Sequence, residues 1–418
     1  MKGEKGLKYA VALAGGGTKG SYQIGVWKAL RELGIEITAV SGTSIGAING
    51  AAMAIGEYEK ARKIWENLDY SMVFDYTKIN GEHEFYEKYE SIKEQLKDIA
   101  KKRGLDITPL RKLLNDAIDE EKLRNSPIDL IIATVSLSLF KPVYKSARDI
   151  PKGQVVDYIL ASAALPIFER IKIDGNTYLD GGAYDLLPIN TLIERGHRNI
   201  IAVDLVGGMG IKRRIKDKNV NIIFIKNSAT IGGILEFDPK LARANVRLGY
   251  LDAMKAFGKN YGKRFYIVDS DRPKYMYALT HDEMKLIFDE ITNGKPNSEK
   301  SRALLRHLFR TLRKYTDENL NPENAVIAAA EIAAETFEIK RVREYSDEAL
   351  VKRIVKTHKS VVKGIIPETH RIDRLKLRLS NLLINDDEFP GVLLLMTLPK
   401  IFITNIFIFL MKKRMAKK

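Results

Sequence analysis

The first sixty residues alternate short β-rich runs with helical patterns, and this alternation constrains the fold more than any other feature of the sequence. Strands are predicted at residues 9–13 and 37–40, and helices at residues 20–33 and 45–55. A strand, a helix and a strand in that order form a crossover unit with parallel strands. We therefore predict an α/β fold of three layers, with a mostly parallel central sheet between two layers of helices.

The same alternation continues to about residue 226 and then gives way to helical patterns. Further strands are predicted at residues 129–135, 177–179, 199–205 and 221–225, and later helices at residues 237–257, 282–291 and 322–337. We expect a catalytic domain over residues 7–270 that carries a charged, aromatic-rich helical insert at 57–126, followed by a helical region at 271–370 and a tail at 371–418.

The cysteine count narrows the possible chemistry. The 418-residue chain has no cysteine, which excludes disulfides, thiol catalysis and cysteine metal sites. Its six histidines form no cluster with metal-ligand spacing, so neither a metal nor another cofactor is predicted. The apolar run at residues 9–14 is too short for a signal peptide, which favours a cytoplasmic protein.

The net charge of +16 favours an anionic partner, and the C-terminal tail indicates which one. Residues 371–418 combine ten basic and four acidic side chains with the most apolar run of the chain. Basic residues beside apolar ones favour an anionic membrane surface over nucleic acid. We expect peripheral contact at the inner face of the membrane.

Residues 391–411 are long enough to cross a bilayer, but two residues near the middle argue against it. Lys400 would place a charge in the hydrocarbon and Pro399 would kink the helix. A basic amphipathic helix is predicted just upstream, with Ile372, Leu375, Leu379 and Leu382 on its apolar face. The tail is therefore expected either to lie in the membrane plane or to pack on protein.

A glycine cluster, Gly15-Gly16-Gly17-Thr18-Lys19-Gly20, lies between the first predicted strand and the first predicted helix. Free backbone amides at such a junction bind anions. Three interpretations remain open: an oxyanion-binding loop, a tight turn, or a dinucleotide fingerprint of Gly15, Gly17 and Gly20 with Glu36 as ribose ligand. A phosphate-binding loop is excluded, because Ser21 stands where that motif requires lysine.

The second motif is Gly42-Thr43-Ser44-Ile45-Gly46, which joins the second strand to the small-residue helix after it. A Gly-x-Ser-x-Gly sequence in a strand-turn-helix setting exposes the serine hydroxyl at a helix N-terminus. The flanking Gly42 and Gly46 leave room for the crowded turn. Ser44 is therefore a candidate nucleophile.

The third motif is Asp180-Gly181-Gly182 at the end of the strand predicted at 177–179. An aspartate at a strand end in an α/β sheet can meet groups at the ends of neighbouring strands. A simple Asp-Gly turn is the alternative. His197, in the loop before another strand, is the one histidine close enough to the sheet to complete a triad, although its setting is typical of a surface residue.

Together the three motifs, in this order, resemble those of the patatin-like phospholipase family. Two other stretches are similar to blocks of its bacterial members: Ala161-Ser162-Ala163-Ala164-Leu165-Pro166 and Gly249-Tyr250-Leu251-Asp252-Ala253. The resemblance spans residues 7–270. It implies a Ser-Asp dyad, with Ser44 as nucleophile and Asp180 as base, and an oxyanion hole from the amides of the loop, assigned to Gly15, Gly16, Gly17, Lys19 and Gly20. Lys19 is a variant that the family permits.

These observations predict a serine hydrolase of the phospholipase A type, which cleaves acyl esters of phospholipids or related lipids. An ordinary aspartate has a pKa of about 3.9 and is a weak base, so the chemistry depends on oxyanion donors worth roughly 3 to 4 kcal/mol each. Two alternatives remain: a nucleotide-binding protein that uses the loop at Gly15–Gly20, and an inactive, membrane-associated patatin-like protein.

Overall fold

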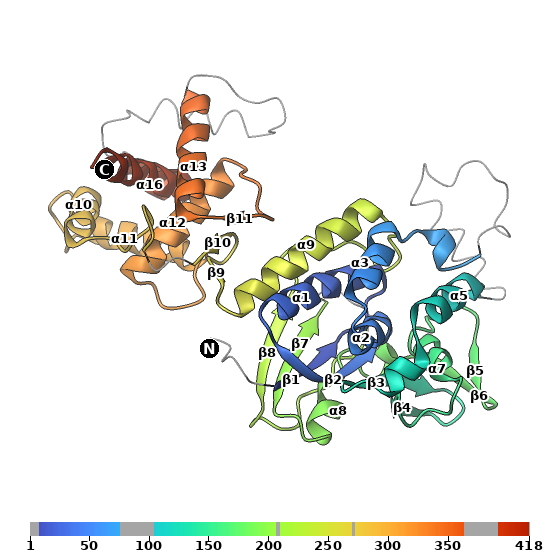
Figure 1. Cartoon of the computed structure of the whole chain (residues 1–418). Helices are drawn as coiled ribbons and strands as arrows, with labels where there is room; N and C mark the ends of the chain where they lie inside the picture. The colour runs from blue at the N-terminus through green and yellow to red at the C-terminus, as the bar shows by residue number, and fades with distance from the viewer. Residues whose placement is uncertain (1–7, 76–103, 206–209, 270–271, 363–391, 418) are drawn as a thin grey trace. The chain divides into compact units, whose positions relative to one another are not determined.

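The computed structural model describes residues 8–75, 104–205, 210–269, 272–362 and 392–417. The chain forms two compact units, Met1–Phe257 and Gly258–Lys418, each described by itself below (Figure 1). Part of the predicted helical insert, residues 76–103, lies outside the described residues, and so does the amphipathic helix predicted near residues 371–382.

A mixed sheet of eight strands is the centre of the first unit (Figure 1). The neighbours β8-β7-β1-β2-β3 run parallel, whereas β4 and β6 pair with β3, and β5 with β6, in antiparallel fashion. The strands are β1 Lys8–Leu13, β2 Glu36–Thr43, β3 Asp129–Ser136, β4 Lys141–Ser146, β5 Ile171–Ile173, β6 Asn176–Asp180, β7 Asn199–Asp204 and β8 Asn221–Lys226. The predicted fold class, a three-layer α/β fold with a mostly parallel sheet, is confirmed.

The helices of this unit pack around the sheet, with α1 and α9 on one face and α8 on the other (Figure 1). They are η1 Gly17–Gly20, α1 Ser21–Glu32, α2 Ile45–Ile55, α3 Tyr58–Asn67, η2 Tyr70–Met72, α5 Thr108–Ala117, α6 Glu120–Arg124, α7 Val155–Ser162, η3 Gly181–Ala183, α8 Ile189–Glu194 and α9 Pro239–Ala256. The strand β1 between the two layers is buried on both sides from Tyr9 to Leu13, which explains its uninterrupted apolar sequence.

Close packing of α1 on α9 explains the stretch at residues 249–253. A Cβ atom on Gly249 would lie 2.0 Å from the backbone oxygen of Tyr22, so a side chain there would force the helices apart. The Tyr22 hydroxyl donates to the Asp252 carboxylate at 3.0 Å across the same contact. Residues 249–253 therefore hold α9 against α1 in the helical layer that covers the sheet.

The second unit is mainly helical and has a small three-stranded sheet. Its elements are β9 Asn260–Tyr261, β10 Tyr266–Val268, α10 His281–Thr292, α11 Glu299–Arg313, α12 Pro322–Thr336, β11 Glu344–Tyr345, α13 Asp347–Val362, α15 Leu393–Thr397 and α16 Pro399–Ala416. Helix α12 begins with a capping box at Asn321, with Pro322 in the first turn. Its alanine-rich surface allows α16 to pack closely on it.

Helix α16 is part of the hydrophobic core of the second unit. Its charged ends are paired: Lys400 lies 3.2 Å from Glu335, and Arg414 lies 2.6 Å from Glu283. Two arrangements were expected for the tail, in the membrane plane or packed on protein. Residues 399–416 pack on protein. Among the described residues, no helix combines the length and the hydropathy that crossing a bilayer requires.

Candidate active site

Ser44 lies at the turn between β2 and α2 in a backbone conformation that few side chains adopt. Its φ is 55° and its ψ is −125°, a sparsely populated region that costs about 1 to 3 kcal/mol. A Cβ atom on Gly42 would lie 2.2 Å from the backbone oxygen of Gly46, and one on Gly46 would lie 2.3 Å from that of Leu13. The two glycines therefore permit a turn that holds Ser44 at the N-terminus of α2.

Strand register brings Ser44 and Asp180 together. Strand β4 occupies one edge of β3 over residues 131–136, so β2 and β6 must share the other edge end to end. On that edge Thr43 pairs with Ala133, and Asp180 pairs with the next residue, Thr134. The last residue of β2 and the last residue of β6 therefore meet, and Ser44 follows directly.

Asp180 is 7% exposed, and its two carboxylate oxygens have different surroundings. Oδ1 accepts the Gly182 N–H at 2.7 Å, whereas Oδ2 is buried and accepts no hydrogen bond of ordinary length within the described part of the chain. Burial raises the pKa of Asp180 to about 6, and the nearby Ser44 side chain and the Gly182 N–H offset part of the rise. The carboxylate is thus a stronger base than an exposed aspartate.

Ser162, at the end of α7, ties the two motifs to the same strand, and no sequence signal distinguishes it within its small-residue block. Its hydroxyl accepts the Ser44 N–H at 2.8 Å and donates to the Ala133 carbonyl at 2.6 Å. Two residues later, the Ala164 carbonyl accepts the Asp180 N–H at 3.0 Å. A single segment therefore fixes the turn at Ser44 and the backbone at Asp180.

Asp185 is a second buried carboxylate behind the turn. It accepts the Tyr144 hydroxyl at 3.0 Å, and its backbone carbonyl accepts the Thr43 hydroxyl at 2.7 Å. Burial raises the pKa of Asp185 to about 6. These contacts anchor the loop after Asp180 to the end of β2.

The amides of the glycine loop divide into engaged and open groups. Three already donate to backbone carbonyls: Gly15 to Leu186 at 3.0 Å, Thr18 to Ile234 at 2.9 Å and Lys19 to Gly16 at 3.3 Å. Across the residues that the structure describes, the Gly16 and Gly17 N–H groups form no hydrogen bond. Gly17 has a φ of +58°, and a Cβ atom there would lie 2.1 Å from the Ile234 carbonyl oxygen, so only glycine fits.

A buried hydrogen-bond chain holds this loop in place. Trp65 donates to the Asn49 side-chain carbonyl at 2.9 Å, and the Asn49 amide donates to Gln23 at 2.8 Å and to the Gly20 carbonyl at 3.0 Å. Gln23 in turn donates to the Ala14 carbonyl at 2.7 Å. No sequence motif indicates this network, because its members come from three different helices.

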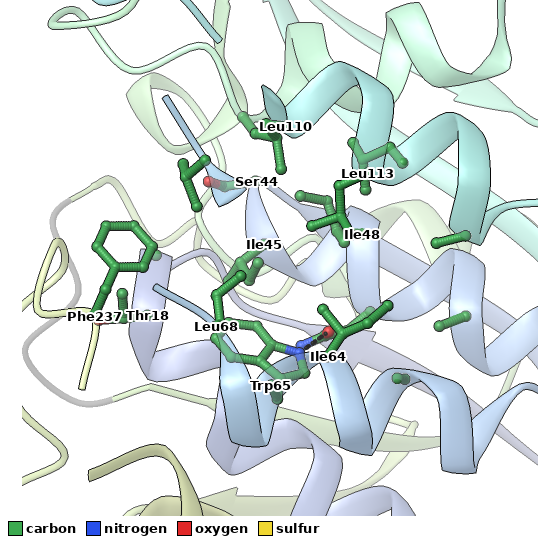
Figure 2. Close-up of a pocket in the computed structure, with 18 of the residues that line it drawn as sticks. Thr18, Ser44, Ile45, Ile48, Ile64, Trp65, Leu68, Leu110, Leu113 and Phe237 are labelled. Carbon is green, nitrogen blue, oxygen red and sulfur yellow. Dashed lines mark hydrogen bonds between the residues drawn. The ribbon is translucent and has the colours of Figure 1, made fainter. Parts of the chain in front are cut away.

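An apolar pocket begins at Ser44 and follows α2 toward Ala52, between α3 and α5 (Figure 2). In Figure 2 Ile45 and Ile48 form its floor on α2, and Leu110 and Leu113 approach from α5. The polar groups that line it at the other end are engaged: Lys60 donates to the Asp116 carbonyl at 2.7 Å and Glu57 pairs with Lys122 at 2.5 Å. The arrangement suits a linear apolar group whose polar end reaches Ser44.

The profile of the family described as "Patatin-like phospholipase" matches residues 11–193, a stretch that holds the glycine loop, Ser44 and Asp180. Residues 11–193 form a patatin-like phospholipase domain. The prediction made from the three motifs is confirmed.

Curated relatives share this domain. The chain is 31% identical over 216 residues to "Lysophospholipase nte1" of Aspergillus terreus, which covers 48% of the chain and 12% of that protein. It is 24% identical over 245 residues to an uncharacterized NTE family protein of Mycobacterium bovis, covering 58% of the chain and 61% of that protein. The chain thus matches less than two thirds of the length of these relatives.

Among solved structures, VipD from Legionella pneumophila aligns with a TM-score of 0.41 at 14% identity, over 97% of this chain and 91% of that one. The type III effector ExoU aligns with a TM-score of 0.35 at 13% identity, over 95% and 76%.

The remaining predicted site residues occupy other places in the first unit. Lys19 is buried, and burial lowers its pKa. Glu36 is the first residue of β2 and pairs with Lys8 at 2.8 Å, at the opposite end of that strand from Ser44. His197 precedes β7, which runs parallel to β1, so it too lies at the amino ends of the parallel strands, away from Asp180. The described residues contain no cluster of three or more potential metal ligands.

Proposed function

We propose that the chain is a serine lipid acyl hydrolase of the phospholipase A type, with Ser44 as nucleophile and Asp180 as base. One observation carries the proposal: Ser44 is held in a strained turn beside a buried, weakly solvated carboxylate, at the mouth of an apolar pocket. Each of these features costs stability, and together they suit acyl transfer.

In the first half of the proposed reaction, Asp180 takes the proton of the Ser44 hydroxyl as its oxygen attacks the ester carbonyl carbon. The carbonyl oxygen becomes negatively charged and is stabilised by the Gly16 and Gly17 amides and by the N-terminus of α2. Of the five loop residues predicted for this role, these two have amides that are open to a ligand. The carbon–oxygen bond then breaks, and the proton held by Asp180 goes to the departing alcohol.

In the second half, Asp180 removes a proton from water, which attacks the acyl-Ser44 ester. The intermediate collapses, Ser44 regains its proton and a fatty acid leaves. The residues of the chain perform every step, and the proposal includes no metal or cofactor.

The proposed substrates are phospholipids or related lipid esters. Apolar side chains line nearly the whole pocket, which favours an acyl chain over a polar ligand. The name of the Aspergillus relative, a lysophospholipase, agrees with this class. The net charge of +16 supports action at the inner face of an anionic membrane. Because residues 399–416 are packed in α16, such contact would depend on the basic side chains of residues 371–378, which lie outside the described residues.

A fluorophosphonate probe tests the proposal together with hydrolysis of a soluble acyl ester. The wild-type protein should be labelled and should hydrolyse the ester, whereas Ser44→Ala should do neither and keep its thermal unfolding profile. Ser71→Ala, which removes an exposed hydroxyl, is the matched control and should behave as wild type. Unlabelled wild-type protein with saturable NAD binding would instead support the nucleotide-binding alternative.

A further inference from the structure

The second unit has an apolar groove that the proposed chemistry does not use. It lies between α10, α11, α12 and α16, with a volume of about 680 Å³, which is within the roughly 300 to 1,000 Å³ typical of small-molecule sites. Its floor consists of buried side chains that belong to the core of the unit: Leu308, Leu312, Val326, Ile406, Phe407 and Leu410.

Large apolar side chains at the mouth of the groove are unusually exposed. Met284 and Phe288 on α10 are 36% and 40% exposed, and Phe309 on α11 is 42% exposed. Such residues are normally covered, and an exposed group of them marks a binding surface. Because the surface is concave, it fits a single apolar chain better than it fits a bilayer or a flat protein face.

Among the residues that the structure describes, the charged or titratable side chains that line the groove are Lys285 and His281, and no carboxylate lines it. Phe309 also belongs to a shallower depression on the outer face of α11, which is lined by Arg306, Arg310 and Arg313. The four acidic residues of α10, which are Asp282, Glu283, Asp289 and Glu290, line neither depression, and Glu283 pairs with Arg414.

The three arginines have no acidic partner in the described part of the chain. Arg310 donates to the His307 ring at 3.0 Å, and none of the three forms an ion pair with a carboxylate there. Uncompensated guanidinium groups beside an apolar groove complement a ligand with an anionic head and a long apolar tail.

We propose that this groove binds a long-chain fatty acid, with its chain between α10 and α11 and its carboxylate toward Arg306 and Arg310. The choice of a fatty acid among long-chain anions rests on the proposed function, which releases one. The groove would hold the product away from the pocket at Ser44 and so give the chain a second lipid site.

The test measures binding of parinaric acid, a polyene fatty acid that fluoresces in apolar sites, to the full-length Ser44→Ala protein. Two sites are expected, one in each unit. Ala329→Phe fills the groove and should remove one of them. Arg306→Gln/Arg310→Gln should weaken one site about tenfold, which corresponds to about 1.4 kcal/mol, and should leave competition by uncharged methyl oleate unchanged.

Arg353→Gln/Lys356→Gln is the matched control, because it removes the same charge from exposed positions of α13 and should change affinity less than twofold. Two sites retained in Ala329→Phe with an unchanged melting temperature would overturn the proposal. So would equal affinity of the two double variants for oleate. If the monomeric acid does not bind and Ala329→Phe abolishes binding to anionic vesicles, the groove is a membrane-docking surface instead.

Hydrolysis separates this proposal from the proposed function. With Ser44 intact, Ala329→Phe should hydrolyse a soluble ester as fast as wild type. If the wild-type protein hydrolyses no ester but Ala329→Phe still removes one parinaric acid site, the groove assignment holds and the catalytic one fails.

Discussion

Replacing Asp180 with asparagine should slow turnover by orders of magnitude and stabilise the first unit in a pH-dependent way. In the native state burial raises the pKa of Asp180 to about 6, compared with 3.8 for an exposed aspartate. The native state therefore binds the proton more tightly than the unfolded chain. The difference of about two units corresponds to roughly 3 kcal/mol that the ionised carboxylate costs the native state above pH 6.

The direction of the pH effect follows from this difference. The contribution of Asp180 to the free energy of unfolding is fully present below pH 3.8 and is lost as the pH rises through about 6. About half of this contribution of roughly 3 kcal/mol is lost between pH 5 and pH 8. The asparagine side chain of the variant would stay neutral and could still accept the Gly182 N–H. The melting temperature of Asp180→Asn relative to wild type should therefore increase by about 3 to 6 °C between pH 5 and pH 8.

Differential scanning calorimetry at several pH values measures this, with the transition of the first unit followed separately. Asp185 also has a pKa raised to about 6, but it is present in both proteins and cancels in the comparison. In the same variant kcat should fall by about 10² to 10⁴, and the wild-type kcat/KM should rise with pH through about 6. A melting difference that does not depend on pH, or a wild-type profile flat between pH 5 and 7, would refute this reasoning.

Three further outcomes are expected. Ser162→Ala should lower kcat about tenfold or more with little change in KM, because the Ser44 N–H and the Ala133 carbonyl lose their shared partner; steady-state kinetics on a soluble ester measure this. His197→Ala should change kcat less than about tenfold in the same assay, and a loss as large as that of Asp180→Asn would indicate a triad. Arg414→Met should destabilise the second unit by about 3 to 5 kcal/mol in thermal unfolding, because Glu283 and buried carbonyls lose their partner; a stability equal to wild type would mean that α16 is not core.

The sequence predicted the parallel half of the sheet well and the antiparallel half poorly. Helix α2 has the predicted bounds, and β3 and β7 start where predicted, because long apolar runs between glycine-rich turns have few other solutions. Strand β4 was not predicted: it lies at an edge, its sequence shows no alternation of polar and apolar residues, and it contains Pro142, which weakens any strand pattern. Helix α11 was given no bounds of its own, although it lies within the helical region predicted at residues 271–370.

The motifs predicted which residues belong to the candidate site, but not which of their backbone amides are open to a ligand. Nothing in the sequence separates the open amides of Gly16 and Gly17 from the engaged amides of Gly15 and Thr18, because the partners of the latter, Leu186 and Ile234, are set by tertiary packing. The contacts of Ser162 depend in the same way on strand register, which is a long-range property.

The strands that position Ser44 and Asp180 and the helices that form the walls of the pocket come from different parts of the chain. The positions of Ser44 and Asp180 depend on β2, β3 and β6, whereas α3 and α5, two walls of the pocket, belong to the chain between β2 and β3. Insertions, deletions and substitutions in that intervening stretch can lengthen, shorten or reshape the pocket while Ser44 and Asp180 keep their spacing. Under the proposed function, a lineage with this architecture can therefore change its lipid substrate without moving Ser44 or Asp180, and a designer could exchange residues 57–118 as a cassette that keeps Trp65, the hydrogen-bond donor to Asn49.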